Sequence, residues 1–126
     1  MYDKGHGLPQ DDVEAVTWIR KAAEQGFALA QNALAALYKV GKGVAQDHAE
    51  AAKWFRKAAE QGNADAQNNL GAIYAEGQGV PRDMIGAYTW LSLAATAGNQ
   101  SAAKNLDIAA QHMDGGRDRR SQATRD

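Results

Sequence analysis

The sequence predicts an all-α protein, an α/α superhelical solenoid of antiparallel helix pairs with 36-residue repeats. Two observations support this fold class. Tryptophan, alanine and glycine positions recur at a fixed spacing of 36 residues. Between them, apolar residues follow the 3.6-residue period of a helix. The chain of 126 residues is long enough for one domain with a buried core.

The period follows from residues that coincide when the sequence is shifted by 36 positions. The segment Lys21–Gly26 recurs unchanged as Lys57–Gly62. The same shift aligns residues of three further types: Trp18, Trp54 and Trp90; Tyr2, Tyr38 and Tyr74; Gly7, Gly43 and Gly79. A helix pair of this size cannot bury its apolar face alone, so neighbouring pairs are expected to stack.

The first helix of each unit, helix A, carries small and apolar residues on one face. In one unit these are Ala66, Leu70, Ile73 and Tyr74. Gly77 should end this helix, because glycine accepts the left-handed conformation found at many helix ends. The second helix, helix B, should end at Gly62. Its apolar stripe consists of Ala51, Trp54, Phe55, Ala58 and Ala59. The three aligned tryptophans are therefore expected in the core.

Helix B follows an aspartate that can cap its start. Asp47 stands three residues before Glu50, and Asp11 three before Glu14, a spacing typical of reciprocal capping. In the next unit Asp83 has a glycine at the later position, so its cap should be weaker. Asn63 is the expected cap of the following helix A.

The expected helices span residues 12–25, 28–40, 48–61, 64–76, 84–97 and 100–113. The solenoid covers 1–113, with full units at 28–63 and 64–99, an incomplete first unit at 1–27 and an incomplete last unit at 100–113. Residues 114–126 have no apolar period and should form a flexible tail. Val13, Trp18 and Ile19 have no preceding helix to cover them, which indicates a fragment of a longer array or an end that pairs with another chain.

The string Ala-x-x-x-Leu-Gly-x-x-Tyr-x-x-Gly-x-Gly-Val at 66–80, followed by Asp83, Ala87 and Trp90, resembles the Sel-one-like repeat (SLR) family. The resemblance spans residues 2–113. The related tetratricopeptide units have 34 residues rather than 36. The resemblance implies an adaptor or scaffold that binds other proteins, and it does not imply catalysis.

Several function classes find no support in the residues. The net charge of −1 gives no basic field for nucleic acid, and no apolar run is long enough for a membrane span. Cysteine is absent, and His6, His48 and His112 have no metal-ligand spacing. We therefore expect no enzyme, no metal and no cofactor.

Without a signal peptide a cytoplasmic location is the default, whereas a segment upstream would allow a periplasmic or secreted protein.

A partner peptide or protein is expected on the concave face, which helices A line in the related tetratricopeptide geometry. Nine residues occupy the non-core positions of these helices: Asn32, Ala36, Lys39, Asn68, Asn69, Ala72, Lys104, Asn105 and Ile108. Asparagine amides can both donate to and accept from a peptide backbone, and Lys104 can hold a carboxylate. Two alternatives stay open. These residues are an ordinary solvated surface, or the chain self-assembles through uncapped ends, for example as a homodimer.

Overall fold

The structure, a computed structural model, describes residues 10–111. Its helices are α1 (Gln10–Glu24), α2 (Ala28–Val40), α3 (His48–Glu60), α4 (Ala64–Glu76) and α5 (Met84–Thr96). A further helix covers residues 100–111 and is called the C-terminal segment below. No strand occurs in this range, and the all-α solenoid predicted from the sequence is confirmed.

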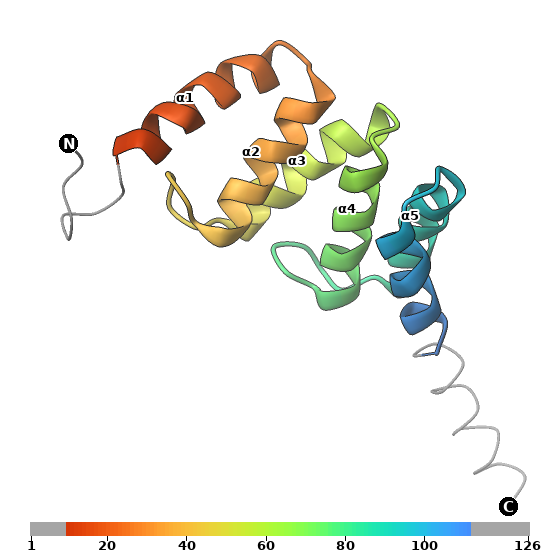
Figure 1. The fold of residues 1–126 in the computed structure, drawn as a ribbon. Helices are drawn as coiled ribbons and strands as arrows, with labels where there is room; N and C mark the ends of the chain where they lie inside the picture. The colour runs from red at the N-terminus through yellow and green to blue at the C-terminus, as the bar shows by residue number, and fades with distance from the viewer. Residues whose placement is uncertain (1–9, 112–126) are drawn as a thin grey trace, which may run out of the picture.

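The helices follow one another in space as they do in the chain (Figure 1). Each packs mainly on its sequence neighbour, so α3 lies between α2 and α4. Short turns at 25–27, 61–63 and 97–99 alternate with longer loops at 41–47 and 77–83. Within the described residues, the predicted helix boundaries agree to within two positions. The predicted end of the last helix, at 113, lies outside them.

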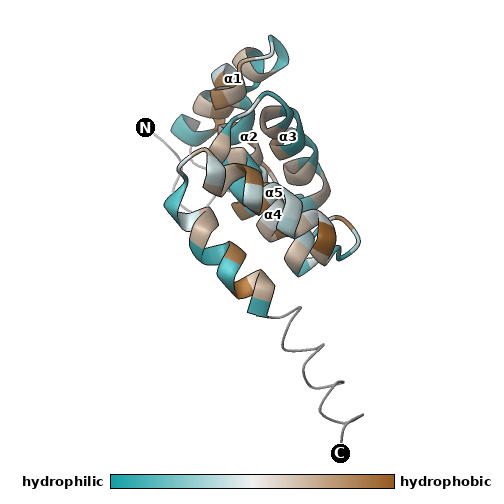
Figure 2. Cartoon of the chain, turned by 90° about the vertical axis from the view of Figure 1, so that its right-hand side faces the viewer, coloured by the Kyte–Doolittle hydropathy of each residue, from teal (hydrophilic) through white to brown (hydrophobic). Residues whose placement is uncertain are grey.

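The core runs along the stack as an apolar stripe contributed by each helix. Figure 2 shows hydrophobic and hydrophilic residues alternating along helices such as α1 and the C-terminal segment. The largest fully buried side chains are Phe55, Leu34, Leu70, Ile73 and Leu91. Ala66 is also fully buried and Tyr74 is half-buried, so the predicted apolar face of helix A is confirmed.

Aspartate side chains cap α3 and α5. Asp47 Oδ1 accepts from the backbone N–H of Glu50 at 3.1 Å, and Asp83 Oδ1 from that of Gly86 at 2.9 Å. The reciprocal half of the predicted cap is wrong, because the Asp47 N–H donates to the Tyr38 carbonyl at 2.8 Å. Asp11 is no cap either, since it lies inside the first turn of α1.

Glycine is required where a loop lies on a helix of the preceding pair. Gly77 ends α4 with φ 70°, as predicted. Gly79 has φ 77°, and a Cβ there would lie 2.4 Å from the carbonyl carbon of His48, at the start of α3. Gly43 faces Asp12 of α1 in the same way, with a Cβ position 2.6 Å from the carbonyl oxygen. This close approach therefore fixes each long loop against the preceding helix B.

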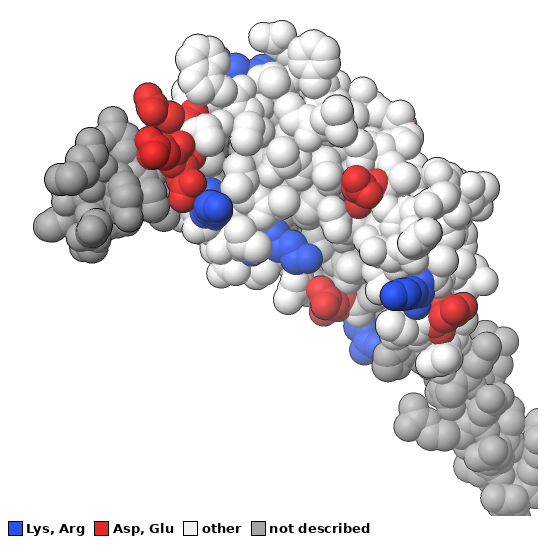
Figure 3. All heavy atoms as spheres, in the orientation of Figure 1, with Lys and Arg blue, Asp and Glu red and all other residues white. Residues whose placement is uncertain are grey.

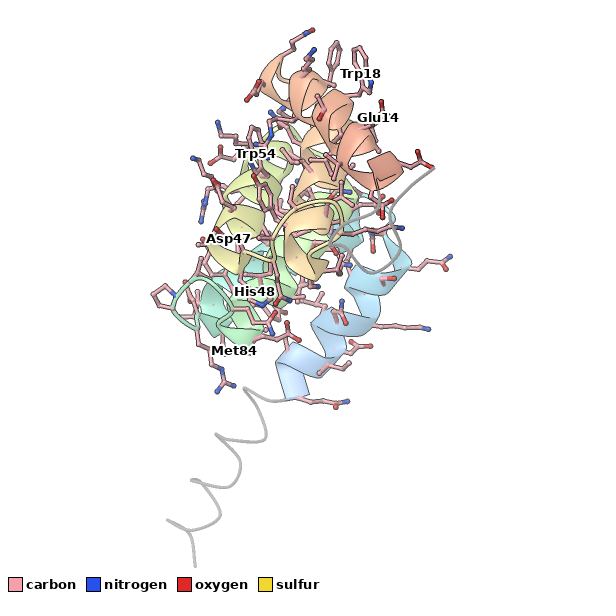
Figure 4. All side chains as sticks on the ribbon, turned by 90° about the vertical axis from the view of Figure 1, so that its left-hand side faces the viewer. Glu14, Trp18, Asp47, His48, Trp54 and Met84 are labelled. Atoms are coloured by element: carbon pink, nitrogen blue, oxygen red, sulfur yellow. The ribbon has the colours of Figure 1, made fainter. Side chains whose placement is uncertain are left out.

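The tryptophans differ in burial. Trp54 is 8% exposed, and Trp90 is half-buried. Trp18 is 68% exposed and projects from α1 away from the other helices (Figure 4), so its assignment to the core is wrong. Among the described helices, none precedes α1 to cover the side on which Trp18 lies. The same reason led us to expect this side, with Val13 and Ile19, to be uncovered.

Candidate functional site

The nine residues expected to bind a partner lie on α2, α4 and the C-terminal segment, whose shared surface is called the helix-A face below. Two side-chain hydrogen bonds join these helices. Asn69 Nδ2 donates to Asn32 Oδ1 at 3.2 Å, and Asn105 Nδ2 donates to Asn68 Oδ1 at 2.9 Å. All four side chains are half-buried. The bonds therefore make one continuous surface from three helices that are distant in sequence.

These bonds give the asparagines a structural role that the sequence did not reveal. Each bond spans 37 residues, from one helix A to the next. An amide side chain has both a donor and an acceptor group, and each bond uses one of them. The NH₂ group of Asn32 and the carbonyl of Asn105 are not used in this pairing. The helix-A face thus keeps polar groups available for a partner, while the two hydrogen bonds hold its helices in a fixed arrangement.

The other predicted residues differ in access to solvent. Ala36 and Lys104 are exposed, and Ile108 is 52% exposed. Lys39 and Ala72 are half-buried. An exposed residue as large and apolar as Ile108 is a feature that a partner could cover.

The helix-A face is hollowed near its C-terminal end. Ala72, Asn105 and Ile108 line a hollow of about 320 Å³ at the junction of α4, the 77–83 loop, α5 and the C-terminal segment. The other lining residues are Ala75, Glu76, Arg82, Met84, Leu91 and Ala109. The structure therefore brings three of the nine predicted residues into one concave site, and the other six are not part of its lining.

Met84, Leu91 and Ala109 were not predicted as site residues, because they occupy core or cap-adjacent positions. A signal for two of them was present in the repeat. The 36-residue shift aligns Leu91 with Phe55, and Ala109 with Ile73. Both replacements reduce side-chain volume in a packed layer, where even a methylene is felt. A comparison of volumes at aligned positions would have indicated the hollow.

Charges are scattered over the face that Figure 3 shows. In the orientation of Figure 3, acidic and basic side chains lie among a larger uncharged area, with an acidic group over the start of α1. The hollow has Glu76 and Arg82 in its lining, one charge of each sign. Among residues 10–111, no three His, Asp or Glu side chains gather as metal ligands. No described helix has the length and hydropathy of a membrane span.

Comparison with known proteins places the chain in a family. The Sel1 repeat model matches residues 1–27, 28–63 and 64–99. The crystal structure of a Sel1 repeat protein from Oxalobacter formigenes is 48% identical with a TM-score of 0.74, and the match covers 76% of this chain and 28% of that one. No curated protein sequence matches the chain.

Two further structures are similar. A protective antigen of uropathogenic Escherichia coli with an SLR fold is 44% identical with a TM-score of 0.79, covering 86% of this chain and 23% of that one. Cysteine-rich protein B of Helicobacter pylori is 26% identical with a TM-score of 0.70, covering 74% and 70%. The chain thus spans about a quarter of the first two relatives. On the match of the repeat model along 1–99, this chain belongs to the Sel1 repeat family.

Proposed function

We propose that this chain is an adaptor that binds a peptide segment of another protein across the concave helix-A face. Sel1 repeat proteins are generally protein–protein interaction modules and typically non-enzymatic scaffolds. The observation that carries the specific proposal is the hollow, because Ala72, Asn105 and Ile108 were assigned to the binding face by register and together line it. Apolar concave sites with a few polar groups are typical of ligand sites.

The contacts of the face suit a peptide backbone. The Asn32–Asn69 and Asn68–Asn105 pairs hold their amides in fixed positions, so little side-chain freedom is lost when a peptide binds. Lys104 is exposed and lies one helical turn before Ile108, where it can meet a carboxylate. Ala36 and Ala72 leave room for main chain between the polar positions.

The test uses dodecapeptides selected from a random library on the wild-type chain. Affinity for one labelled peptide is then measured by fluorescence anisotropy. Lys104→Glu and Ala72→Arg alter the charge and shape of the helix-A face and should weaken binding at least about tenfold. Lys53→Glu, on an exposed position of α3, is the matched charge control and should bind as wild type. If all three variants bind equally, the proposal is wrong.

A second candidate function, self-assembly of two copies, is favoured by one observation on α1. Its residues Ala15, Trp18, Ile19 and Ala22 align with a face of α3 that is buried: Ala51, Trp54, Phe55 and Ala58. Head-to-tail stacking would bury Asp107, which is exposed and aligns with buried Ala35 and Gly71. Burying an unpaired carboxylate is unfavourable. A second copy would therefore pair through α1 with α1.

Mass measured over a concentration series tests this alternative. A dimer through α1 should be lost in Trp18→Glu and kept in Trp90→Phe. A monomeric mass at all concentrations would exclude self-assembly.

A further inference from the structure

The hollow on the helix-A face exists because the repeat loses volume at its C-terminal end. One unit earlier, the aligned positions hold Phe55 and Ile73, which are 0% and 1% exposed. Around the hollow these positions are Leu91 and Ala109. The exchange removes an aromatic ring and most of a branched side chain from one layer. The remaining lining side chains leave about 320 Å³ open.

Leu91 does not fill this space, because its side chain packs on α4. Its Cγ lies 2.7 Å from the position that a Cβ on Gly71 would take. Only a glycine permits this approach, and the aligned residue one unit earlier is Ala35. Leu91 therefore leans toward the α4 backbone, while Ala109 is too short to fill the hollow from the other side.

From this geometry we propose that the hollow takes one large apolar side chain, of leucine, methionine or phenylalanine size, from the bound peptide. This rests on the proposed function and adds the chemistry of the anchor residue. The chain itself shows what fits this place, since an aromatic and a branched aliphatic side chain fill the aligned layer one unit earlier. Ala72, Ala75 and Met84, which are half-buried, give the anchor apolar walls.

The rim of the hollow agrees with an uncharged anchor. Glu76 and Arg82 contribute one negative and one positive charge, so the lining carries no net charge that would favour a charged side chain. Asn105 lies in the lining and keeps its carbonyl for a peptide N–H next to the anchor. Ile108, at 52% exposure, would be covered by the same residue. Met84 is half-buried, and its flexible side chain can adjust to anchors of different shape.

The experiment fills the hollow with the residues that fill its counterpart. Ala109→Ile and, separately, Leu91→Phe restore the residues of the preceding unit without changing charge. Each should lower the affinity for the library-selected dodecapeptide by about 10- to 100-fold, the range expected for losing one buried apolar side chain. Ala103→Ile places the same new side chain on an exposed position of the same helix and should leave the affinity unchanged. An unfolding midpoint at or above that of wild type shows that each variant folds.

The peptide provides the second half of the test. Replacing its anchor by alanine should weaken binding to wild type but have little further effect on Ala109→Ile, which is the signature of a direct contact in a double-mutant cycle. If a peptide binds Ala109→Ile as tightly as wild type yet loses affinity for Lys104→Glu, the proposed anchor in the hollow is wrong. Binding across the helix-A face would still be supported. Failure to select any peptide would overturn both.

Two other occupants of the hollow would be recognised in the same samples. If a second copy fills it, Ala109→Ile lowers the oligomeric mass. If the chain's own residues 112–126 fill it, the substitution shifts their NMR resonances in the absence of peptide. Either result contradicts the proposal.

Discussion

Helices α1 and α3 end in closely similar sequence, yet their tryptophans have opposite environments. Trp18 is 68% exposed, whereas Trp54 is 8% exposed. Their local contacts are alike, since Lys21 lies 4.8 Å from the Trp18 ring and Lys57 lies 5.0 Å from the Trp54 ring. The difference comes from packing: α3 lies between α2 and α4, whereas α1 packs on α2. In this solenoid, the burial of a residue depends on the helices that pack against it and not on the sequence of its own helix.

The largest effect should separate these two tryptophans. Trp54→Ala should reduce the free energy of unfolding by about 3–5 kcal/mol, because it leaves a cavity in the core. Trp18→Ala should cost less than about 1 kcal/mol, in the range of surface substitutions. Urea unfolding of both variants measures the difference. Equal losses would show that α1 is covered in solution.

Gly79 and Gly62 both have a positive φ, but their surroundings differ. Gly79 and Gly62 have φ values of 77° and 93°. A Cβ added at Gly79 would meet atoms of α3, whereas one added at Gly62 would have no atom within 4 Å. Gly62→Ala should cost about 1–2 kcal/mol for the left-handed backbone. Gly79→Ala should cost about 1–3 kcal/mol more through its clash with α3. Thermal unfolding midpoints of the two variants would contradict this if they agreed.

The start of α2 lacks the cap that α4 has. Asn63 Oδ1 accepts from the Ala66 N–H at 2.8 Å, whereas Phe27, at the aligned position, makes no side-chain cap. The two backbones are alike, with φ −70° and ψ 113° at Asn63 and φ −71° and ψ 117° at Phe27. Phe27→Asn should therefore stabilise the fold by about 1 kcal/mol. Chemical denaturation tests this, with Asn63→Ala as the converse control; a neutral Phe27→Asn would count against equivalent caps.

An effect of similar or smaller size concerns a glutamine that is absent from the last unit. Gln61 Nε2 donates to Gln31 Oε1 at 2.8 Å and to the Gly26 carbonyl at 2.9 Å. One unit later the donor is replaced by Ala97, and Gln67 Oε1 is buried with no hydrogen-bond partner among the described residues. Ala97 has nearly the backbone conformation of Gln61. Ala97→Gln should thus add about 0.5–1.5 kcal/mol.

A matched background isolates this last bond. In Gln67→Met the acceptor is absent, so Ala97→Gln should bring little gain there. An equal gain in both backgrounds, measured by denaturant midpoints, would assign the effect to something other than the hydrogen bond.

Much of the fold was predictable because it depends on local rules. The period fixed the order of helices, Gly77 and Gly62 marked helix ends, and Asp47 and Asn63 cap as expected. The reciprocal cap failed, because it depends on whether a distant carbonyl takes the Asp47 N–H. Tyr38 provides that carbonyl, and no local pattern indicates it.

The candidate site was less predictable, because it depends on distances between helices. Register alone placed Asn68 and Asn105 on successive helices A, but their hydrogen bond depends on how closely the helices approach. The hollow arises from small side-chain volumes at Leu91 and Ala109 and from the leaning of Leu91 on Gly71. Periodicity reports which face a residue occupies, but not how fully its layer is packed.

The most direct test of where this molecule binds is a backbone NMR titration of the wild-type chain with the library-selected dodecapeptide. If the peptide binds as proposed, shifts should concentrate at Asn68, Asn105 and Ile108 and extend along the helix-A face. Shifts confined to Trp18 and Ile19 on α1 would contradict this proposal, and would make the uncovered end the binding surface.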